Sequence, residues 1–217
     1  MSRHQRSSLW PKNQFRVPIA NPAVLGGSQR KLFETLTATW VKSANQLGVQ
    51  ATTEDGRLIG PFNVLQLHPE VSEKLSDFQF AESTHTILSP QVRELVILMV
   101  GAVWGAHHEL YAQNSVGREA GLSDHAIATL AKWDIAGELN DQEMIAALLT
   151  YDLLTHHRVD DGLHRRAEQA FGTTGLFDIT AVMGVYLTVC TGLILFDVPV
   201  PCAAADPRKS SDALERP

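Results

Sequence analysis

The side chains best suited to acid–base chemistry lie between Arg93 and Arg118, around a long apolar run. Glu94 stands at the start of that run, in which every residue from Leu95 to Val100 is apolar. A carboxylate in such surroundings needs a cationic partner or a raised pKa. Near a helix start it could equally be an exposed acid that favours the positive end of the helix dipole. Glu94 is therefore a candidate for proton transfer.

A second polar group follows at residues 107–113, "HHELYAQ", where a new helix is expected. Glu109 and Gln113 are four residues apart and share one helix face, and His107 and Tyr111 share another. Histidines in a first helical turn feel the positive dipole end, which lowers their pKa and favours neutral imidazole near pH 7. The sequence does not decide whether His107 or His108 points inward, and either could face solvent.

These residues divide into two predicted roles. Proton transfer is assigned to Glu94, His108 and Glu109. Substrate contacts are assigned to side chains that can hold an oxygen or pair with a carboxylate. This second set contains His107, Tyr111, Gln113, Arg93, Arg118 and, from the preceding loop, His85.

Other chemistries lack their required residues. Adjacent histidines diverge by about 100° around a helix, and His-Glu-x-x-His is absent, so no metal is predicted. The chain contains no glycine-rich phosphate loop and no Gly-x-Ser-x-Gly elbow. The segment "TTEDG" is too short for a calcium loop. We therefore expect a small-molecule substrate and no cofactor.

Helical signals follow one another along almost the whole chain after residue 28. Ser28, Ser89, Ser123, Asn140 or Asp141, and Asp160 or Asp161 are suitable helix N-caps. No run alternates convincingly as a strand, and no repeat is visible. The prediction is an all-α fold, with a loop at 52–65 and helices at about 29–47, 69–82, 90–104, 107–120, 124–133, 141–157, 162–171 and 174–198.

One apolar segment, 179–196, has 18 residues without a charge, which is the minimum length for a membrane span. Three threonines, two glycines and a cysteine dilute it, and Asp178 and Asp197 bracket it. A central helix buried on all sides has the same composition. We predict such a buried helix and no membrane association.

Charge and composition suggest three regions. Residues 1–33 carry six basic side chains and no acid, so the rest of the chain carries −12 where the whole carries −6. We expect an extended basic arm at 1–27, a single helical domain at 28–201 and a disordered tail at 202–217. The arm could be a transit peptide or could lie on a partner subunit. The acidic domain argues against nucleic-acid binding, and two unpaired cysteines favour a cytoplasmic location.

The stretch "RELVILMVGAVWGAHHELYAQNSVGREAGLSDHAI", residues 93–127, resembles the carboxymuconolactone decarboxylase and alkylhydroperoxidase D-like (AhpD-like) family. It is closer to the longer, cysteine-free branch, and the likeness extends over about 160 residues. The resemblance implies a helical homo-oligomer whose pocket lies between the Glu94 helix and the next one. Glu94 and Glu109 match glutamates of that branch, whereas Gln113 stands at its histidine.

The resemblance also bears on the reaction. In peroxidase members the redox cysteines would fall on Ala106 and Glu109, so thiol peroxidase activity is not expected. His108 and Leu110 replace the tyrosine and tryptophan that are usual in the nearer branch. The implied function is a cofactor-free lyase or isomerase acting on a small cyclic carboxylated or lactone-type substrate. The alternative is a non-catalytic small-ligand-binding or decayed helical oligomer of the same family.

Overall fold

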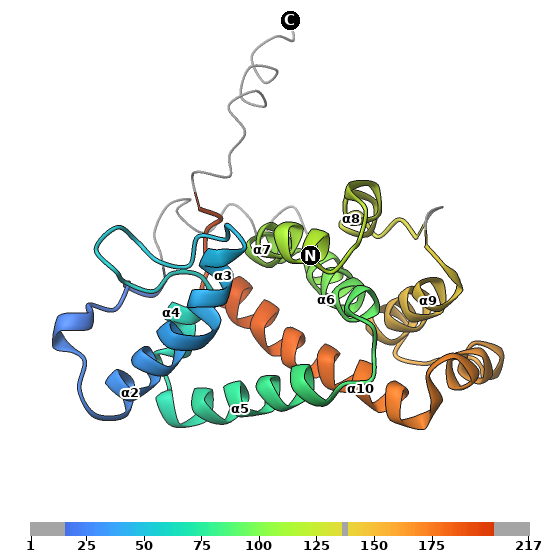
Figure 1. Cartoon of the computed structure of the whole chain (residues 1–217), viewed down its shortest axis with the longest axis horizontal. Coiled ribbons are helices and arrows are strands. Elements are labelled where there is room, and N and C mark those ends of the chain that lie inside the picture. Colours follow the sequence, from blue (N-terminus) through green and yellow to red (C-terminus); the bar gives the residue numbers. More distant parts are fainter. Residues whose placement is uncertain (1–15, 136–138, 202–217) are drawn as a thin grey trace, which may run out of the picture.

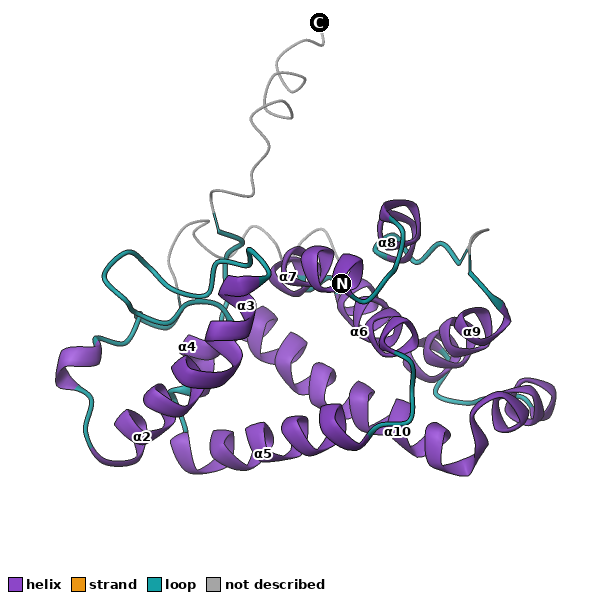
Figure 2. Cartoon of the chain, in the orientation of Figure 1, coloured by secondary structure: helices purple, strands orange, loops and turns teal. Residues whose placement is uncertain are grey.

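The computed structural model describes residues 16–135 and 139–201, and these residues form helices joined by loops (Figures 1 and 2). Their one β-type pairing is an isolated bridge between Thr52 and Leu58. The all-α prediction is confirmed. The greater part of the predicted arm, residues 1–15, and the predicted tail, 202–217, lie outside the described residues. In chain order the elements are a 3₁₀ turn Pro22–Val24, α2 Gly27–Leu36, a π-helical turn Thr37–Val41, α3 Lys42–Gln46, α4 Pro61–Leu65, α5 Pro69–His85, α6 Pro90–Trp104, α7 His107–Glu119, α8 Asp124–Leu130, α9 Asp141–Thr155 and α10 Asp161–Leu195.

Several helix ends fall where the sequence predicts them. Ser89 Oγ accepts from the Val92 amide at 3.2 Å to cap α6, which ends at Gly105 in the left-handed region with φ 66°. Ser123 caps α8 in the same way. Asn140 and Glu143 form a reciprocal capping box at the start of α9. Local side-chain chemistry therefore sets these boundaries.

Other predicted features of the helices differ from the structure. Ser28 does not cap α2, because its hydroxyl donates to Glu70 Oε1 at 2.6 Å and Gly26 takes the N-cap position. The first helix also passes through a π-helical turn at Thr37–Val41 before α3. α5 continues beyond the predicted end at residue 82, to His85. Tertiary contacts and backbone geometry, which propensity does not report, account for the first two differences.

α4 lies within the predicted loop. Pro61 occupies its first turn, where the missing amide hydrogen costs nothing. Asn63 connects α4 to residues 18–20. Its side chain accepts from the Ala20 amide at 3.0 Å and donates to the Pro18 carbonyl at 3.3 Å. The described part of the predicted arm thus lies on its own chain's α4, and Arg16 donates to the Leu195 carbonyl at 2.6 Å.

α10 combines two predicted helices across a break. Gly172 has φ 64° and ψ 175°, which interrupts the helical backbone between the predicted helices at 162–171 and 174–198. By its length and composition alone, α10 is long and apolar enough to cross a membrane. Ile179, Val182 and Val185 are nevertheless fully buried within the protein. This portion of α10 therefore packs one face into the core, whereas Thr180, Gly184 and Thr188 on its other face are exposed, so the helix is not buried on all sides as predicted.

The core is centred on α6, whose residues from Leu95 to Val100 are at most 1% exposed. α7, α8, α9 and α10 all contact α6 (Figure 1). A second, smaller apolar cluster joins α2, the π-helical turn and the following loop through Leu32, Leu36, Val41, Ala51 and Leu58. The candidate site lies where these two clusters meet.

Candidate functional site

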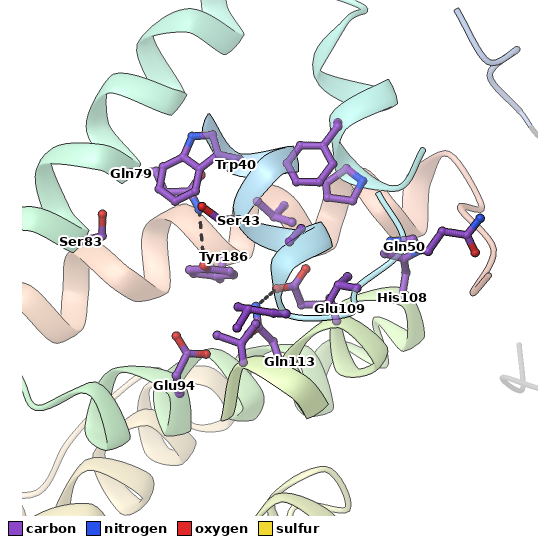
Figure 3. A pocket seen from close by; sticks show the side chains of 18 of the residues that line it. Trp40, Ser43, Gln50, Gln79, Ser83, Glu94, His108, Glu109, Gln113 and Tyr186 are labelled. Carbon is purple, nitrogen blue, oxygen red and sulfur yellow. Dashed lines mark hydrogen bonds between the residues drawn. The ribbon is translucent and has the colours of Figure 1, made fainter. Parts of the chain in front are cut away.

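A cavity of about 220 Å³ lies between the N-terminal helices and α5, α6, α7 and α10 (Figure 3). An apolar wall surrounds a few polar groups, as in many small-molecule sites. Its lining consists of Trp40, Ser43, Ala44, Leu47, Val49, Gln50, Ile59, Pro61, Phe62, Leu65, Gln79, Ser83, Arg93, Glu94, His108, Glu109, Ala112, Gln113, Val116, Tyr186 and Val189.

Arg93 is bound by two carboxyl groups. Its Nε and Nη2 donate to Glu82 Oε1 and Oε2 at 2.9 and 2.7 Å, a two-pronged pair, and its Nη1 donates to Glu94 Oε1 at 3.0 Å. The guanidinium also lies 5.8 Å from the centre of the Tyr186 ring. The Glu82 side chain is 1% exposed, so this pair is shielded from solvent. The charge of Arg93 is therefore largely balanced within the protein.

Glu94 is a buried acid with one unpaired oxygen. Its Oε2 has no hydrogen-bond partner among the described residues. Burial raises the pKa of Glu94 to about 7, against the opposing charge of Arg93, and the charge of Glu109 raises it further. The carboxyl of Glu94 therefore exchanges its proton near neutral pH, where a general acid or base is most effective.

Glu109 is the second buried carboxyl of the cavity. Gln113 Nε2 donates to its Oε1 at 2.7 Å, which confirms the predicted shared face of α7. Burial raises the pKa of Glu109, and the hydrogen bond from Gln113 lowers it. Gln113 Oε1 is buried without a partner among the described residues. Two acids and one amide thus line the same cavity.

His108 is the histidine that points inward, whereas His107 is exposed. The Nδ1 atom of His108 lies 2.7 Å from the carbonyl oxygen of Pro199. Because this oxygen is an acceptor, the neutral ring carries its hydrogen on Nδ1. Burial lowers the pKa of His108 and favours this neutral form. Its Nε2 abuts Gly60, where an added Cβ would lie 2.3 Å away. His108 therefore joins α7 to the C-terminal segment.

The structure brings five of the nine predicted site residues to the cavity: Arg93, Glu94, His108, Glu109 and Gln113. The other four do not line it. His85 and His107 are exposed, and Arg118 pairs with Asp124 on the surface. Tyr111 lies close by, its hydroxyl accepting from the Gln50 amide at 3.2 Å. Within the described residues no three metal-binding side chains form a cluster.

Several residues in or next to the cavity were not predicted. Glu82 holds Arg93 from α5, and Gln79 Nε2 donates to the Tyr186 hydroxyl at 3.4 Å, joining α5 to α10 (Figure 3). Tyr186 carries a hydroxyl within the apolar run at 179–196, and this hydroxyl was the sequence signal that α10 could contact polar groups of the cavity. Trp40 belongs to the predicted apolar stripe of the first helix and lines the cavity from the π-helical turn.

Comparisons with known proteins bear on the fold. No family model matches the chain, and no curated protein matches it. A peroxidase-related protein from Silicibacter sp. TM1040 is 15% identical, with a TM-score of 0.66, covering 90% of this chain and 96% of that one. A putative antioxidant defence protein AhpD from Agrobacterium tumefaciens is 16% identical, with a TM-score of 0.58, and the alignment covers 64% of this chain and 96% of that one.

A third solved structure is a cysteine-to-alanine variant of the debrominase Bmp8 in complex with 2,3,4-tribromopyrrole. It is 12% identical, with a TM-score of 0.63, and the alignment covers 86% of this chain and 94% of that one. The fold is AhpD-like. At these identities the likeness establishes the fold, while the reaction has to be argued from the cavity.

Proposed function

We propose that the protein is a cofactor-free lyase or isomerase that moves a proton on a small cyclic, lactone-type substrate held in this cavity. One observation carries the proposal: Glu94 and Glu109 are two buried carboxyls on one cavity, and burial raises the pKa of both. Neighbouring carboxyls whose charges interact titrate as a pair. Near neutral pH such a pair can hold one proton and act as acid and base together.

The pair can shift a double bond without outside reagents. The ionised carboxyl removes a proton from the ring carbon beside the carbonyl, and the protonated carboxyl gives its proton to the carbonyl oxygen. The substrate is then a neutral enol, and the pair still holds one proton. Return of a proton to a different ring carbon, with loss of the enol proton to the other carboxyl, completes an isomerisation. The same enol would follow loss of carbon dioxide from a carboxylated ring.

The contacts of Arg93 favour an uncharged substrate over a carboxylated one. Its guanidinium already pairs with Glu82 and Glu94, and Arg118 lies on the surface with Asp124. A substrate carboxylate would have to displace one of these carboxyls. Isomerisation of an uncharged lactone is therefore favoured over decarboxylation.

Thiol chemistry is not part of the proposal. Cys190 is fully buried in the core, and it does not line the cavity. Burial raises the pKa of its thiol, which disfavours the thiolate that such chemistry needs. The tribromopyrrole bound by the debrominase is a single ring, and the volume here suits a ligand of that general size, since a cavity of about 150 Å³ holds benzene.

Conversion of α-angelica lactone into its conjugated β isomer, followed by ultraviolet absorbance, tests the proposal. 4-Carboxymuconolactone is assayed in parallel, with chelator present in both assays. Glu94→Gln and Glu109→Gln should each lower turnover about a hundredfold or more, because neither amide can exchange a proton at neutral pH. Glu73→Gln, the same change at an exposed glutamate outside the cavity, serves as the control and should keep the turnover of wild type. Unchanged turnover in both glutamine variants contradicts the proposal.

A second candidate function is small-ligand binding without turnover. Glu94 Oε2 and Gln113 Oε1 are buried acceptors without partners among the described residues, and such atoms are costly unless a ligand satisfies them. Absence of turnover on every lactone, together with saturable binding of a small ring, would favour this alternative.

We also infer that the chain assembles as a homo-oligomer through the outer face of α5 and the end of α10. Val71 is 60% exposed and Leu195 is 61% exposed on a groove that Leu67, Trp104 and Ile194 also line. An exposed apolar surface of this kind is typical of an interface. Light scattering should show Leu195→Glu with a smaller mass than wild type, and Val24→Glu, at another exposed apolar residue, with an unchanged one. A monomeric wild type contradicts the inference.

A further inference from the structure

Two residues that line the cavity each have a buried oxygen without a hydrogen-bond partner among the described residues. Glu94 is 5% exposed and Gln113 is 6% exposed, and both line the cavity. Glu94 Oε2 and Gln113 Oε1 have no donor among the described residues. Buried polar atoms are satisfied in most proteins, so unpaired oxygens on residues that line a cavity are candidates for contact with a ligand. The ligand is therefore expected to bring hydrogen on oxygen or nitrogen.

The orientation of Gln113 is fixed by its neighbour. Gln113 Nε2 donates to Glu109 Oε1 at 2.7 Å, so the NH₂ group of the amide faces the carboxyl group. The amide oxygen is consequently directed away from Glu109 and has no partner among the described residues. Glu109 thus determines which atom of Gln113 the ligand meets.

The charges around the cavity disfavour an ionic ligand. Among the described lining residues the strong cation is Arg93, and Glu82 and Glu94 already pair with it. A ligand carboxylate would lie near Glu94 and Glu109 without a free cation. An ammonium group would have to lose its hydration against walls such as Leu47, Ile59 and Val116. A neutral donor avoids both costs.

The size and walls of the cavity favour a flat ring. Its volume of about 220 Å³ exceeds that of a cavity that holds benzene. Trp40, Phe62 and Tyr186 supply aromatic surface on which a ring can pack.

We infer that the cavity recognises a neutral, single-ring enol or phenol, whose hydroxyl hydrogen is accepted by Gln113 Oε1 or Glu94 Oε2. This rests on the proposed function in one respect, since the neutral enol is the intermediate of proton transfer between the two carboxyls. A lactone in its keto form lacks this hydrogen, whereas its enol carries it. The unused acceptors would therefore favour the intermediate over the substrate, and phenols would bind as stable analogues of the enol.

Binding of small aromatic probes, measured by NMR titration at pH 7, tests the inference without any turnover. Each isomer of dihydroxybenzene is compared with the difluorobenzene of the same substitution pattern, which has no donor and is no larger. At least one diol should bind about tenfold or more tightly than its difluoro counterpart. Benzoate and benzylamine are the anionic and cationic probes, and both should bind more weakly than that diol.

Variants then locate the donor contact. Gln113→Met removes the amide oxygen while keeping side-chain length, and it should reduce the preference for the diol severalfold. Gln142→Met, the same change at an exposed glutamine outside the cavity, should leave the preference unchanged. Thermal unfolding of each variant identifies any that fails to fold, in which case the comparison of probes on the wild-type protein decides alone.

Equal binding of diols and difluorobenzenes overturns the inference, as does failure of every diol to bind. Tighter binding of benzoate or benzylamine than of any diol also overturns it. The proposed function fails separately, through unchanged turnover in both Glu94→Gln and Glu109→Gln. A protein that prefers diols without turning over lactones would thus lose the proposed reaction and keep the ligand class.

Discussion

Gln113 donates a hydrogen bond to Glu109 across 2.7 Å, one turn back along α7, and both side chains are buried in the cavity wall. This hydrogen bond lowers the pKa of Glu109, whereas burial raises it. The amide thus limits how strongly the carboxyl holds its proton. A histidine at position 113, which the family resemblance implies as the usual residue, could exchange a proton itself, whereas glutamine can only orient and stabilise the carboxylate.

Gln113→Met should raise the pKa of Glu109 above its wild-type value, because the donor that stabilises the carboxylate is removed. Carboxyl ¹³C NMR as a function of pH measures this change directly. Gln79→Met is the matched control, since the Gln79 amide contacts Tyr186. A Glu109 titration that is the same in wild type and Gln113→Met contradicts the assigned contact.

The stability of the protein should fall as pH rises through neutrality. The pKa of Glu94 is raised from 4.5 to about 7 in the folded state, so folding favours its protonated form. Its contribution is complete below pH 4.5 and is lost as pH rises through 7. At about 1.36 kcal/mol per pH unit, this shift corresponds to about 3 kcal/mol. Glu109 acts in the same direction.

Glu94→Gln should therefore flatten this dependence, because the amide does not titrate. Urea unfolding at several values between about pH 4.5 and 8 gives the free energy of unfolding for both proteins. The variant should be relatively more stable than wild type at pH 8 than at pH 5. If both proteins lose stability equally over this range, Glu94 is not the titrating group.

Glu82→Gln should destabilise the fold by about 3 kcal/mol, because it leaves the buried guanidinium of Arg93 with one carboxyl partner in place of two. The charge of Glu82 also raises the pKa of Glu94, so that pKa should fall in the variant. Glu73→Gln, in the exposed pair with Lys31, is the control and should not change stability measurably. A Glu82→Gln protein as stable as wild type would show that the buried pair adds nothing.

The sequence predicts those parts of the fold and site that depend on local chemistry. Ser89, Ser123 and Asn140 cap helices because their oxygens reach nearby amide hydrogens. The burial of Glu94 follows from the apolar run behind it, and the Glu109–Gln113 contact follows from four-residue spacing.

The rest depends on contacts between distant segments. Glu82 reaches Arg93 because the turn after α5 brings these two helices together, which no periodicity reports. Whether His107 or His108 points inward is decided by Gly60 and Pro199, from two other parts of the chain. α4 is too short for a periodic signal, and Asn63 holds it through residues 18–20.

The contact between Gly60 and His108 gives the last prediction. Gly60 has φ 64°, and an added Cβ would meet His108 Nε2 at 2.3 Å, so alanine there adds a clash to backbone strain. Gly56 has φ 79° and nothing near its added Cβ, so alanine there meets a positive φ without a clash. Gly60→Ala should cost about 3 kcal/mol and Gly56→Ala about 1 kcal/mol, measured by urea unfolding. In a His108→Ala background the difference between the two alanine substitutions should shrink, because only the clash depends on the ring, although φ 64° and ψ −144° keep alanine strained at position 60. An undiminished difference there would mean that His108 does not fill the space beside Gly60.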